Sequence, residues 1–341
     1  MNEKVCNVFV DNEAYRPFKY QWAVNSERKQ RIEMHWHEGQ AELQDDLRQF
    51  NTVDGMKTAN VSHAVNKSIL EKSIMIFTEM DVAVGAGYTE LLPYVKNNEI
   101  RTLWMTQAAR EVTHQRAYAL AAETFGFHDS SWVEFKEYAA MRTKIDVISS
   151  KVADLHLYIN FCKKLIILLL GEGIALFGAF GCLLNMKRHG IMMGFNVVNE
   201  WSLKDEFEHV NNNIAVLKEI IPFLTHAERQ ELREFIIQTV EMYRNAEHNF
   251  IDVVFKLGNQ EDMTIVQMKG YIDYLCKYRM YQLDIVPAEE LITNTLPWMD
   301  YILSAQMHSN FFETKVTSYV HRKLHGEIDY EKFKYMVKPL C

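Results

Sequence analysis

The chain has 341 residues, 48% of them hydrophobic, so it is long and apolar enough to bury a sizeable core. Its formal net charge is −8 and no large Lys/Arg cluster occurs, which argues against nucleic-acid binding. Five scattered cysteines, without a C-x-x-C pair or an apolar leader, predict reduced thiols in a cytoplasmic protein.

Helix-breaking residues are scarce, with 14 glycines and 6 prolines, and no Val/Ile-rich runs alternate with glycine turns. This composition predicts an all-α fold. After an irregular start to about residue 24, we expect helices over residues 25–50, 63–90, 98–125, 130–149, 152–185, 190–221, 226–257 and 261–284, and from 297 to about 317. Asn98 is the expected N-cap of the third helix, and Gly126 its end.

The helices expected over 63–90 and 98–125 carry the first candidate ligands. Asp81 stands in the apolar stretch "IMIFTEMDVAV", and Glu111 and His114 form a Glu-x-x-His pair in "EVTH". Residues i and i+3 share a helix face, so the pair can offer an oxygen and a nitrogen to one ion. Tyr118 follows one turn later on the same face.

The helix expected over 152–185 contains the run "LIILLLGEGIALFGAFGCLL", in which Glu172 is the one charged residue. About 20 apolar residues are long enough to span a membrane. An ionisable group near the middle of a span is costly, however, and no second span is present. We therefore favour a buried core helix, in which the Glu172 carboxylate must be paired, protonated or bound to a metal.

The helix expected over 190–221 carries a second Glu-x-x-His pair, Glu206 and His209 in "EFEH". Asp81 precedes Glu111 by 30 residues, and Glu172 precedes Glu206 by 34. Two helical hairpins would thus each present a lone carboxylate beside a Glu-x-x-His. Taken singly, each acid could be a surface or ion-paired residue. Jointly, four carboxylates and two histidines are typical of dinuclear iron or manganese sites in helical bundles.

At "EVTHQRAY" the sequence resembles the small subunit of class I ribonucleotide reductase, which stores a tyrosyl radical. The resemblance implies a ferritin-like helical bundle with additional helices. It also implies that one metal is bound by Asp81, Glu111 and His114 and the other by Glu172, Glu206 and His209. Tyr118 falls on the radical position.

Three further stretches extend the resemblance over about residues 17–320. "RIEMHWHEGQAEL" resembles the family motif whose tryptophan carries electrons, here Trp36. "KDEFEH" places Asp205 where the family aspartate links that tryptophan to a metal-bound histidine, which we expect to be His209. "NFFETKVTSY" resembles the stretch before the tail tyrosine that relays the radical between subunits, here Tyr319, with Glu313 six residues earlier.

By resemblance, a dinuclear iron centre, with manganese possible instead, reacts with oxygen and oxidises Tyr118. The radical then passes through Trp36 and Tyr319 to a separate large catalytic subunit that reduces ribonucleotides to deoxyribonucleotides. A homodimer is the usual arrangement, and neither a membrane nor nucleic acid is expected as a partner. We expect one bundle domain over residues 1–320 and a flexible tail over 321–341 that docks on the large subunit.

Two departures from the family pattern affect details. Leu176 stands where the family often has a phenylalanine near the radical, although Phe180 agrees, and the tail contains lysines and ends in Cys341. Two other functions compete with the reductase assignment. A di-iron oxygenase or oxidase of the same bundle type would lack Tyr118 and the tail relay, and a ferritin-like storage protein would need neither Trp36 nor Tyr319.

Overall fold

The computed structural model describes residues 5–12, 16–128, 130, 132 and 139–308, and over these residues the chain is helical, with one isolated bridge between Gln260 and Met263. The predicted all-α class is confirmed. The α-helices are α1 (Gln21–Arg28), α2 (Gln44–Asn51), α3 (His63–Leu91), α4 (Asn98–Phe125), α6 (Ala139–Ile148), α7 (Tyr158–Gly173), α8 (Phe177–Arg188), α9 (Met193–Ile220), α10 (His226–Val254), α11 (Ile265–Gln282) and α12 (Pro297–His308).

Short helical turns join several of these helices. One is a π-helical turn, η2 (Lys29–Glu33), and the others are the 3-10 turns η1 (Asn7–Phe9), η3 (Glu38–Gln40), η4 (Ile221–Phe223), η5 (Phe255–Leu257) and η6 (Ala288–Glu290).

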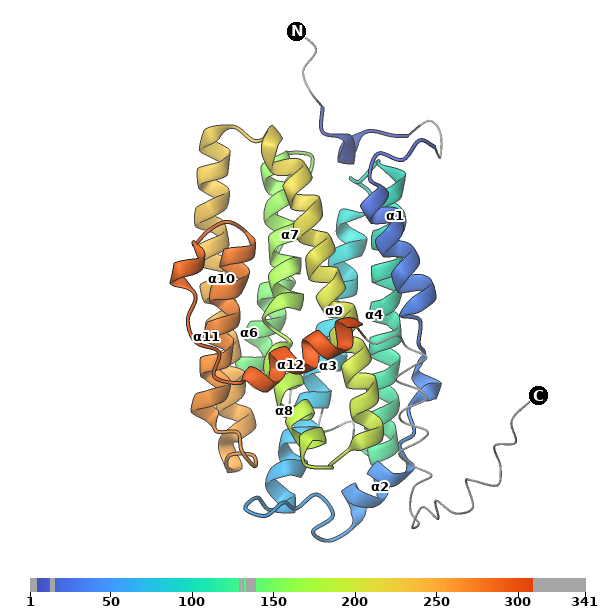
Figure 1. Ribbon diagram of the computed structural model, residues 1–341, viewed down its shortest axis with the longest axis vertical. Coiled ribbons are helices and arrows are strands. Elements are labelled where there is room, and N and C mark those ends of the chain that lie inside the picture. The colour runs from blue at the N-terminus through green and yellow to red at the C-terminus, as the bar shows by residue number, and fades with distance from the viewer. Residues whose placement is uncertain (1–4, 13–15, 129, 131, 133–138, 309–341) are drawn as a thin grey trace, which may run out of the picture.

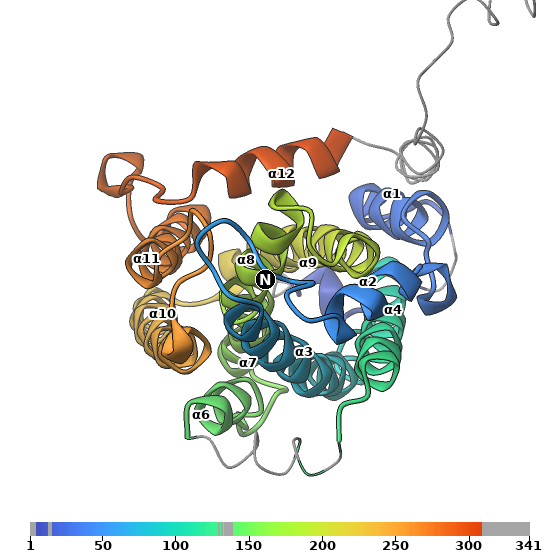
Figure 2. The ribbon, with the colours of Figure 1, turned by 90° about the horizontal axis from the view of Figure 1, so that it is seen from below.

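The long helices run side by side as an elongated bundle (Figure 1). Seen along the bundle, α3, α4, α9 and the α7–α8 pair surround its centre, while α1 and α2 lie on one side and α6, α10 and α11 on the other (Figure 2). Helix α12 crosses the outside of the bundle (Figures 1 and 2). This is a helical bundle with additional helices, as predicted.

Local sequence signals explain the ends of the helices that form the centre. The Ser62 side chain accepts a hydrogen bond from the Val65 amide and so caps α3. The Asn97 side chain caps α4 through the Ile100 amide, so the cap is one residue earlier than the predicted Asn98. Gly126 ends α4 in the left-handed conformation, at φ 73°, as predicted from the sequence.

The apolar run containing Glu172 is a core element. The segment Tyr158–Arg188 is long and apolar enough to cross a membrane, but its most hydrophobic window is entirely buried among the other helices. The reading as a core helix, rather than a membrane span, is therefore the one that the packing supports.

The prediction of one helix over 152–185 was wrong, because the chain leaves the helix at residues 174–176, between α7 and α8. The Gly173 carbonyl accepts a hydrogen bond from Nε of Arg279 at 3.1 Å instead of continuing a helical ladder. A Cβ on Gly173 would lie 2.8 Å from that Nε, so a glycine permits the close approach.

The prediction of one helix over 25–50 was also wrong. Helix α1 begins earlier, at Gln21, and after η2 the chain is extended at His37 before η3 and α2. The Trp36 carbonyl accepts a hydrogen bond from Nη1 of Arg110 at 3.0 Å, and the Trp36 side chain is bound inside the bundle. Tertiary contacts therefore override the helical propensity of this stretch.

The remaining expected helices are present, with ends that differ by a few residues. The expected helix over 190–221 begins at Met193, and the one over 261–284 is shorter, spanning Ile265–Gln282. Of the helix expected over 130–149, Ala139–Ile148 is described as α6. Glu313, Tyr319 and the tail expected over 321–341 lie outside the described residues.

Candidate metal centre

Six predicted ligands meet at the middle of the bundle, and all six side chains are fully buried. Each of the four central helices contributes. The ligands are Asp81 from α3, Glu111 and His114 from α4, Glu172 from α7, and Glu206 and His209 from α9. Each Glu-x-x-His pair projects from one face of its helix, as its spacing predicts.

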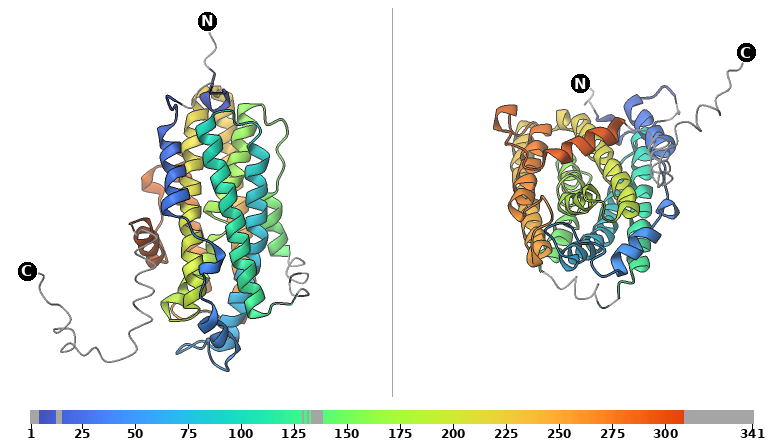
Figure 3. Two further views of the ribbon diagram at one scale, coloured as in Figure 1. Left: turned by 90° about the vertical axis from the view of Figure 1, so that its right-hand side faces the viewer. Right: turned by 60° about the horizontal axis from the view of Figure 1, so that its bottom comes forward.

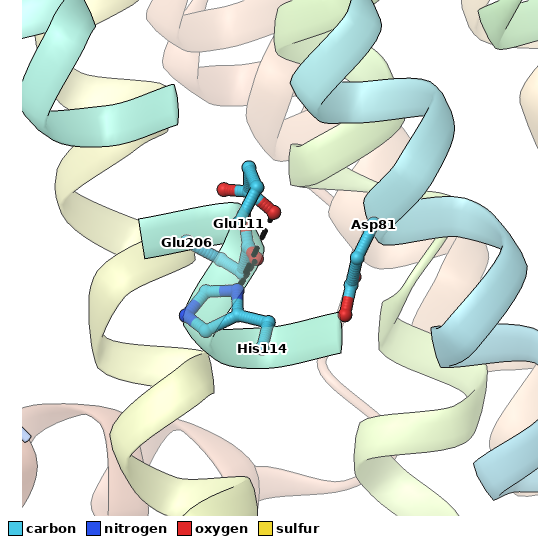
Figure 4. A group of neighbouring side chains, drawn as sticks. All are labelled: Asp81, Glu111, His114 and Glu206. Carbon is cyan, nitrogen blue, oxygen red and sulfur yellow. Dashed lines mark ion pairs between the residues drawn. The ribbon is translucent and has the colours of Figure 1, made fainter. Parts of the chain in front are cut away.

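The first group of ligands consists of Asp81, Glu111, His114 and Glu206, with one donor atom from each lying within 4.8 Å of the others. Nδ1 of His114 is 3.1 Å from Oε1 of Glu206 and 3.4 Å from Oε2 of Glu111. Asp81 reaches toward this group from the opposite helix α3 (Figure 4). These atoms can hold one metal ion.

The second group consists of Glu111, Glu172, Glu206 and His209, again with donor atoms within 4.8 Å. Nδ1 of His209 is 3.1 Å from Oε1 of Glu111 and 3.2 Å from Oε1 of Glu172. Glu111 and Glu206 belong to both groups. The prediction divided the six ligands into two separate sets of three, whereas the geometry gives two overlapping sets that share two carboxylates.

Burial makes Asp81 and Glu172 hard to ionise without a cation. Desolvation raises the pKa of Asp81 well above its usual range, and Glu111 and Glu206 add repulsion. Desolvation also raises the pKa of Glu172 to about 8, despite its contact with His209. For Glu111, the opposing effect of the two histidines outweighs burial and lowers the pKa. A bound cation would stabilise the ionised forms of these carboxylates.

The histidines respond in the opposite direction. Burial lowers the pKa of His114, but its carboxylate neighbours, Glu111 first, outweigh burial and raise that pKa well above the usual value. The pKa of His209 is raised in the same way, chiefly by Glu111 and Glu172. Without a cation, the imidazoles thus carry the compensating positive charge.

Tyr118 lies one turn beyond His114 and is fully buried. Its ring stacks on Phe77 with centroids 4.4 Å apart and planes 6° from parallel, and Phe195 approaches edge-on. The hydroxyl donates a hydrogen bond to Oδ1 of Asn199 at 3.3 Å. Burial, followed by the charge of Asp81, raises the pKa of Tyr118 well above its usual value, so the phenol keeps its proton.

Trp36 and Asp205 are brought together as predicted, but with a different histidine. The indole Nε1 donates to Oδ2 of Asp205 at 2.9 Å, and the same oxygen lies 3.1 Å from Nε2 of His114. The expected partner, His209, was wrong. Nδ1 of His209 faces Glu111 and Glu172, while His114 presents Nδ1 to the carboxylates and leaves Nε2 for Asp205.

Several residues of the site were not predicted. The Tyr88 hydroxyl donates to Oε1 of Glu172 at 2.9 Å, and Nδ2 of Asn213 donates to Oε2 at 3.1 Å. Tyr88 lies seven residues after Asp81, and Asn213 four after His209, so helical spacing places both near the ligand faces and could have identified them. Phe77, Asn199 and Arg110 were missed because they contribute contacts rather than ligands.

Comparisons with known proteins agree with this geometry. The family model described as "Ribonucleotide reductase, small chain" matches residues 13–288. A probable ribonucleoside-diphosphate reductase small subunit, 048L of Invertebrate iridescent virus 3, is 27% identical over 94% of this chain and 87% of its own length.

Two solved structures share the fold. The Rnr4 homodimer of Saccharomyces cerevisiae matches with a TM-score of 0.69 at 15% identity, covering 92% of each chain. The dimanganese(II)-NrdF of Streptococcus sanguinis matches with a TM-score of 0.67 at 12% identity, covering 84% of this chain and 99% of its own.

Proposed function

The chain belongs to the ribonucleotide reductase small-chain family, and from this premise we propose that its buried ligands hold the two metals that generate a radical on Tyr118. The radical serves a large catalytic subunit, which reduces ribonucleoside diphosphates to deoxyribonucleotides. The observation that carries the proposal is the pair of overlapping ligand groups, with Tyr118 one helical turn beyond His114.

The residues fit a dinuclear centre by their chemistry. Four carboxylates can neutralise two divalent cations, and the two shared carboxylates, Glu111 and Glu206, would contribute to holding both. Within the described residues, neither oxygen of Asp81 makes a hydrogen bond, although both are buried. Such an orphaned carboxylate is costly unless a cation compensates it. Oxygen-rich ligands with imidazole favour iron or manganese over copper or structural zinc.

We propose iron as the native metal, two ions per chain, with manganese as the alternative. A protein of the same fold is a dimanganese protein, so the fold accommodates manganese. Anaerobic loading with each metal, followed by exposure to oxygen and electron paramagnetic resonance, distinguishes them. The native metal is the one whose loading yields a tyrosyl radical and supports turnover with the large subunit.

When bound, the metals supply an oxidant made with oxygen. Tyr118 would give one electron and its hydroxyl proton to that oxidant and so become a neutral radical. Phe77 covers one face of the ring, and Phe195 approaches its edge, so these apolar side chains exclude water and reductants. Asn199 accepts the hydroxyl hydrogen bond and holds the ring in one orientation.

The path out of the site begins at Trp36. Its indole is stacked on the His114 ring, with centroids 5.6 Å apart, and is hydrogen-bonded through Asp205 to the same histidine. We assign Trp36 and Asp205 to radical transfer on the basis of this chain of contacts. Tyr319, the proposed exit to the large subunit, lies outside the described residues and rests on the sequence resemblance alone.

The proposed assembly is a homodimer that binds the large subunit through the tail over 321–341. The homodimer is supported by the solved Rnr4 relative.

A cytoplasmic location is supported by the cysteines, because Cys6, Cys162, Cys182 and Cys276 are all free and buried.

The decisive test is Tyr118→Phe. This variant removes only the phenolic hydroxyl, so it should bind two metals per chain as before, lose the radical signal and abolish nucleotide reduction with the large subunit. The matched control is Tyr271→Phe, because Tyr271 is equally buried and its hydroxyl has no hydrogen-bond partner in the described part of the chain. Undiminished reduction by Tyr118→Phe would refute the proposed role.

A further inference from the structure

Arg110, on α4 immediately before the ligand Glu111, is buried between Trp36 and Asp205, with 4% of its surface exposed. Nε and Nη2 donate to Oδ2 of Asp205 at 3.0 and 2.7 Å, and Nη1 donates to the Trp36 carbonyl at 3.0 Å. The centre of the guanidinium lies 4.8 Å from the centroid of the Trp36 ring. Every one of these contacts is to Trp36 or Asp205.

One oxygen connects this cluster. Oδ2 of Asp205 accepts hydrogen bonds from Trp36 and from two nitrogens of Arg110, and it also faces His114. Oδ1 of Asp205 makes no hydrogen bond within the described residues. A planar guanidinium is well suited to hold both an acceptor oxygen and an aromatic face in place. Arg110 therefore fixes the distance and orientation between the indole and Asp205.

The charge of Arg110 also acts on the Trp36 ring. Removing an electron from Trp36 leaves a positive charge on the indole, which the anionic Asp205 would stabilise. A guanidinium at 4.8 Å opposes that charge, and in a buried site the opposition is weakly screened. The guanidinium charge therefore offsets the stabilisation that Asp205 gives to the oxidised indole.

We propose that Arg110 is a positioning residue that holds the Trp36 indole against Asp205 and makes Trp36 harder to oxidise. This inference rests on the proposed radical function. With the metals bound, Trp36 would give one electron to the oxidant that they supply. The indole keeps its Nε1 proton, hydrogen-bonded to Asp205, and becomes a cation radical.

The first test uses the metal-free protein and does not depend on the proposed function. The indole N–H of Trp36 gives one nitrogen–proton NMR signal, assigned by its loss in Trp36→Phe. Arg110→Gln should shift this signal and speed its exchange with solvent, whereas Arg101→Gln, at an exposed position on the same helix, should leave it unchanged. An unshifted signal in a folded Arg110→Gln protein would show that Arg110 does not position the indole.

The second test uses metal-loaded protein in a Tyr118→Phe background, where the electron must come from another side chain. After exposure to oxygen, the Trp36 radical is followed by absorbance and electron paramagnetic resonance. Arg110→Gln should raise its yield about tenfold or more, since a nearby positive charge is removed. Arg110→Lys keeps the positive charge but loses the planar guanidinium that places two nitrogens on Asp205. Its Trp36 radical yield should therefore stay near that of the protein with Arg110, even though the NMR signal of the indole shifts.

Equal yields in Arg110→Gln and the Arg110 protein would overturn the electrostatic part of the proposal, as would a yield in Arg110→Lys as high as in Arg110→Gln. If Arg110→Gln does not fold, the NMR signal of the Trp36 indole in Arg110→Lys decides whether the orientation of the indole depends on the guanidinium group. Failure of the proposed function itself would appear differently. The protein with Tyr118 intact would then form no tyrosyl radical, while the NMR result on the metal-free protein would still stand.

Discussion

Asp81 and Glu172 carry the largest electrostatic cost in the metal-free centre, but their surroundings differ. Glu172 receives hydrogen bonds from Tyr88 and Asn213, whereas Asp81 receives none within the described part of the chain. Burial nevertheless raises the pKa of both side chains. Hydrogen bonds alone thus do not compensate a buried carboxylate here. Protons must occupy the site when metal does not.

Metal binding should therefore release protons. With a pKa of about 8, Glu172 holds a proton at neutral pH in the metal-free protein, and both histidines are held protonated. Because ligands must be deprotonated, uptake of Mn²⁺ without oxygen in weak buffer should acidify the solution by at least about one proton per chain. A pH indicator measures this release directly.

The direction of the pH dependence follows from Glu172. Its folded pKa is raised above the ordinary 4.5, so its contribution to metal-free stability is full below that value and is lost as the pH rises through about 8. Metal affinity should accordingly fall as the pH drops below 8. Glu172→Gln should release fewer protons on metal binding. Binding without any proton release would contradict the charge distribution described above.

Among the helices, α6 and α10 are joined by a buried ion pair outside the metal centre. Nζ of Lys144 is 2.6 Å from Oε1 of Glu247, both side chains are fully buried, and Nζ lies 4.0 Å from the Phe250 ring centroid. Burial raises the pKa of Glu247 to about 7 and lowers that of Lys144. Both shifts favour the neutral forms, so desolvation outweighs the attraction between the two charges.

Removing one partner should destabilise the protein far more than removing both. Lys144→Met leaves Glu247 buried without its cation and should cost about 3–5 kcal/mol in the free energy of unfolding. The double variant Lys144→Met/Glu247→Leu should regain most of this loss. Denaturant unfolding of the metal-free proteins measures both changes. A double variant as unstable as the single one would mean that the pair itself stabilises the contact between α6 and α10.

The pH dependence provides a second check on the same pair. Because the folded pKa of Glu247 is raised, its contribution to stability is full below pH 4.5 and is lost as the pH rises through about 7. The loss of stability with rising pH should be larger in Lys144→Met, where no cation stabilises the ionised Glu247. It should be absent in the double variant. Unfolding curves measured on either side of pH 7 compare the three proteins.

Helix existence could be predicted from the sequence, but two interruptions could not. At each interruption a backbone carbonyl accepts a hydrogen bond from an arginine distant in sequence, since Arg110 donates to the Trp36 carbonyl and Arg279 to the Gly173 carbonyl. Propensity and periodicity describe contacts within a few residues. They contain no information about a backbone carbonyl used by a side chain from another helix.

For the molecule as a whole, the ligands were predictable because helical spacing alone places each Glu-x-x-His on one face. The histidine that contacts Asp205 could not be predicted from helical spacing. The resemblance of "KDEFEH" to the family motif led us to expect His209 as the partner, yet Asp205 reaches His114 on α4. Which nitrogen of which imidazole is available depends on how all four helices pack around the centre. That arrangement is a property of the folded chain.

Helices α3 and α4 lie side by side at the front of the bundle in the left view of Figure 3. Exposed apolar side chains occur on both, since Val82 is 55% exposed, Met105 57% and Val112 43%. Met105 and Val112 are seven residues apart and so share one side of α4. Apolar side chains grouped on neighbouring helices are typical of a surface that another protein covers. We expect the second copy of the proposed homodimer to cover it.

Met105→Glu should therefore weaken dimerisation. A carboxylate introduced at this surface would be buried without a partner in the dimer, and the dissociation constant should rise about a hundredfold or more. Sedimentation equilibrium measures it. Ile237→Glu is the matched control, because Ile237 is 43% exposed on α10, which lies on the opposite side of the bundle from α4 (Figure 2), and this change should leave the dimer intact. Dissociation by Ile237→Glu, with no effect of Met105→Glu, would place the dimer contact on the α10 side of the bundle instead.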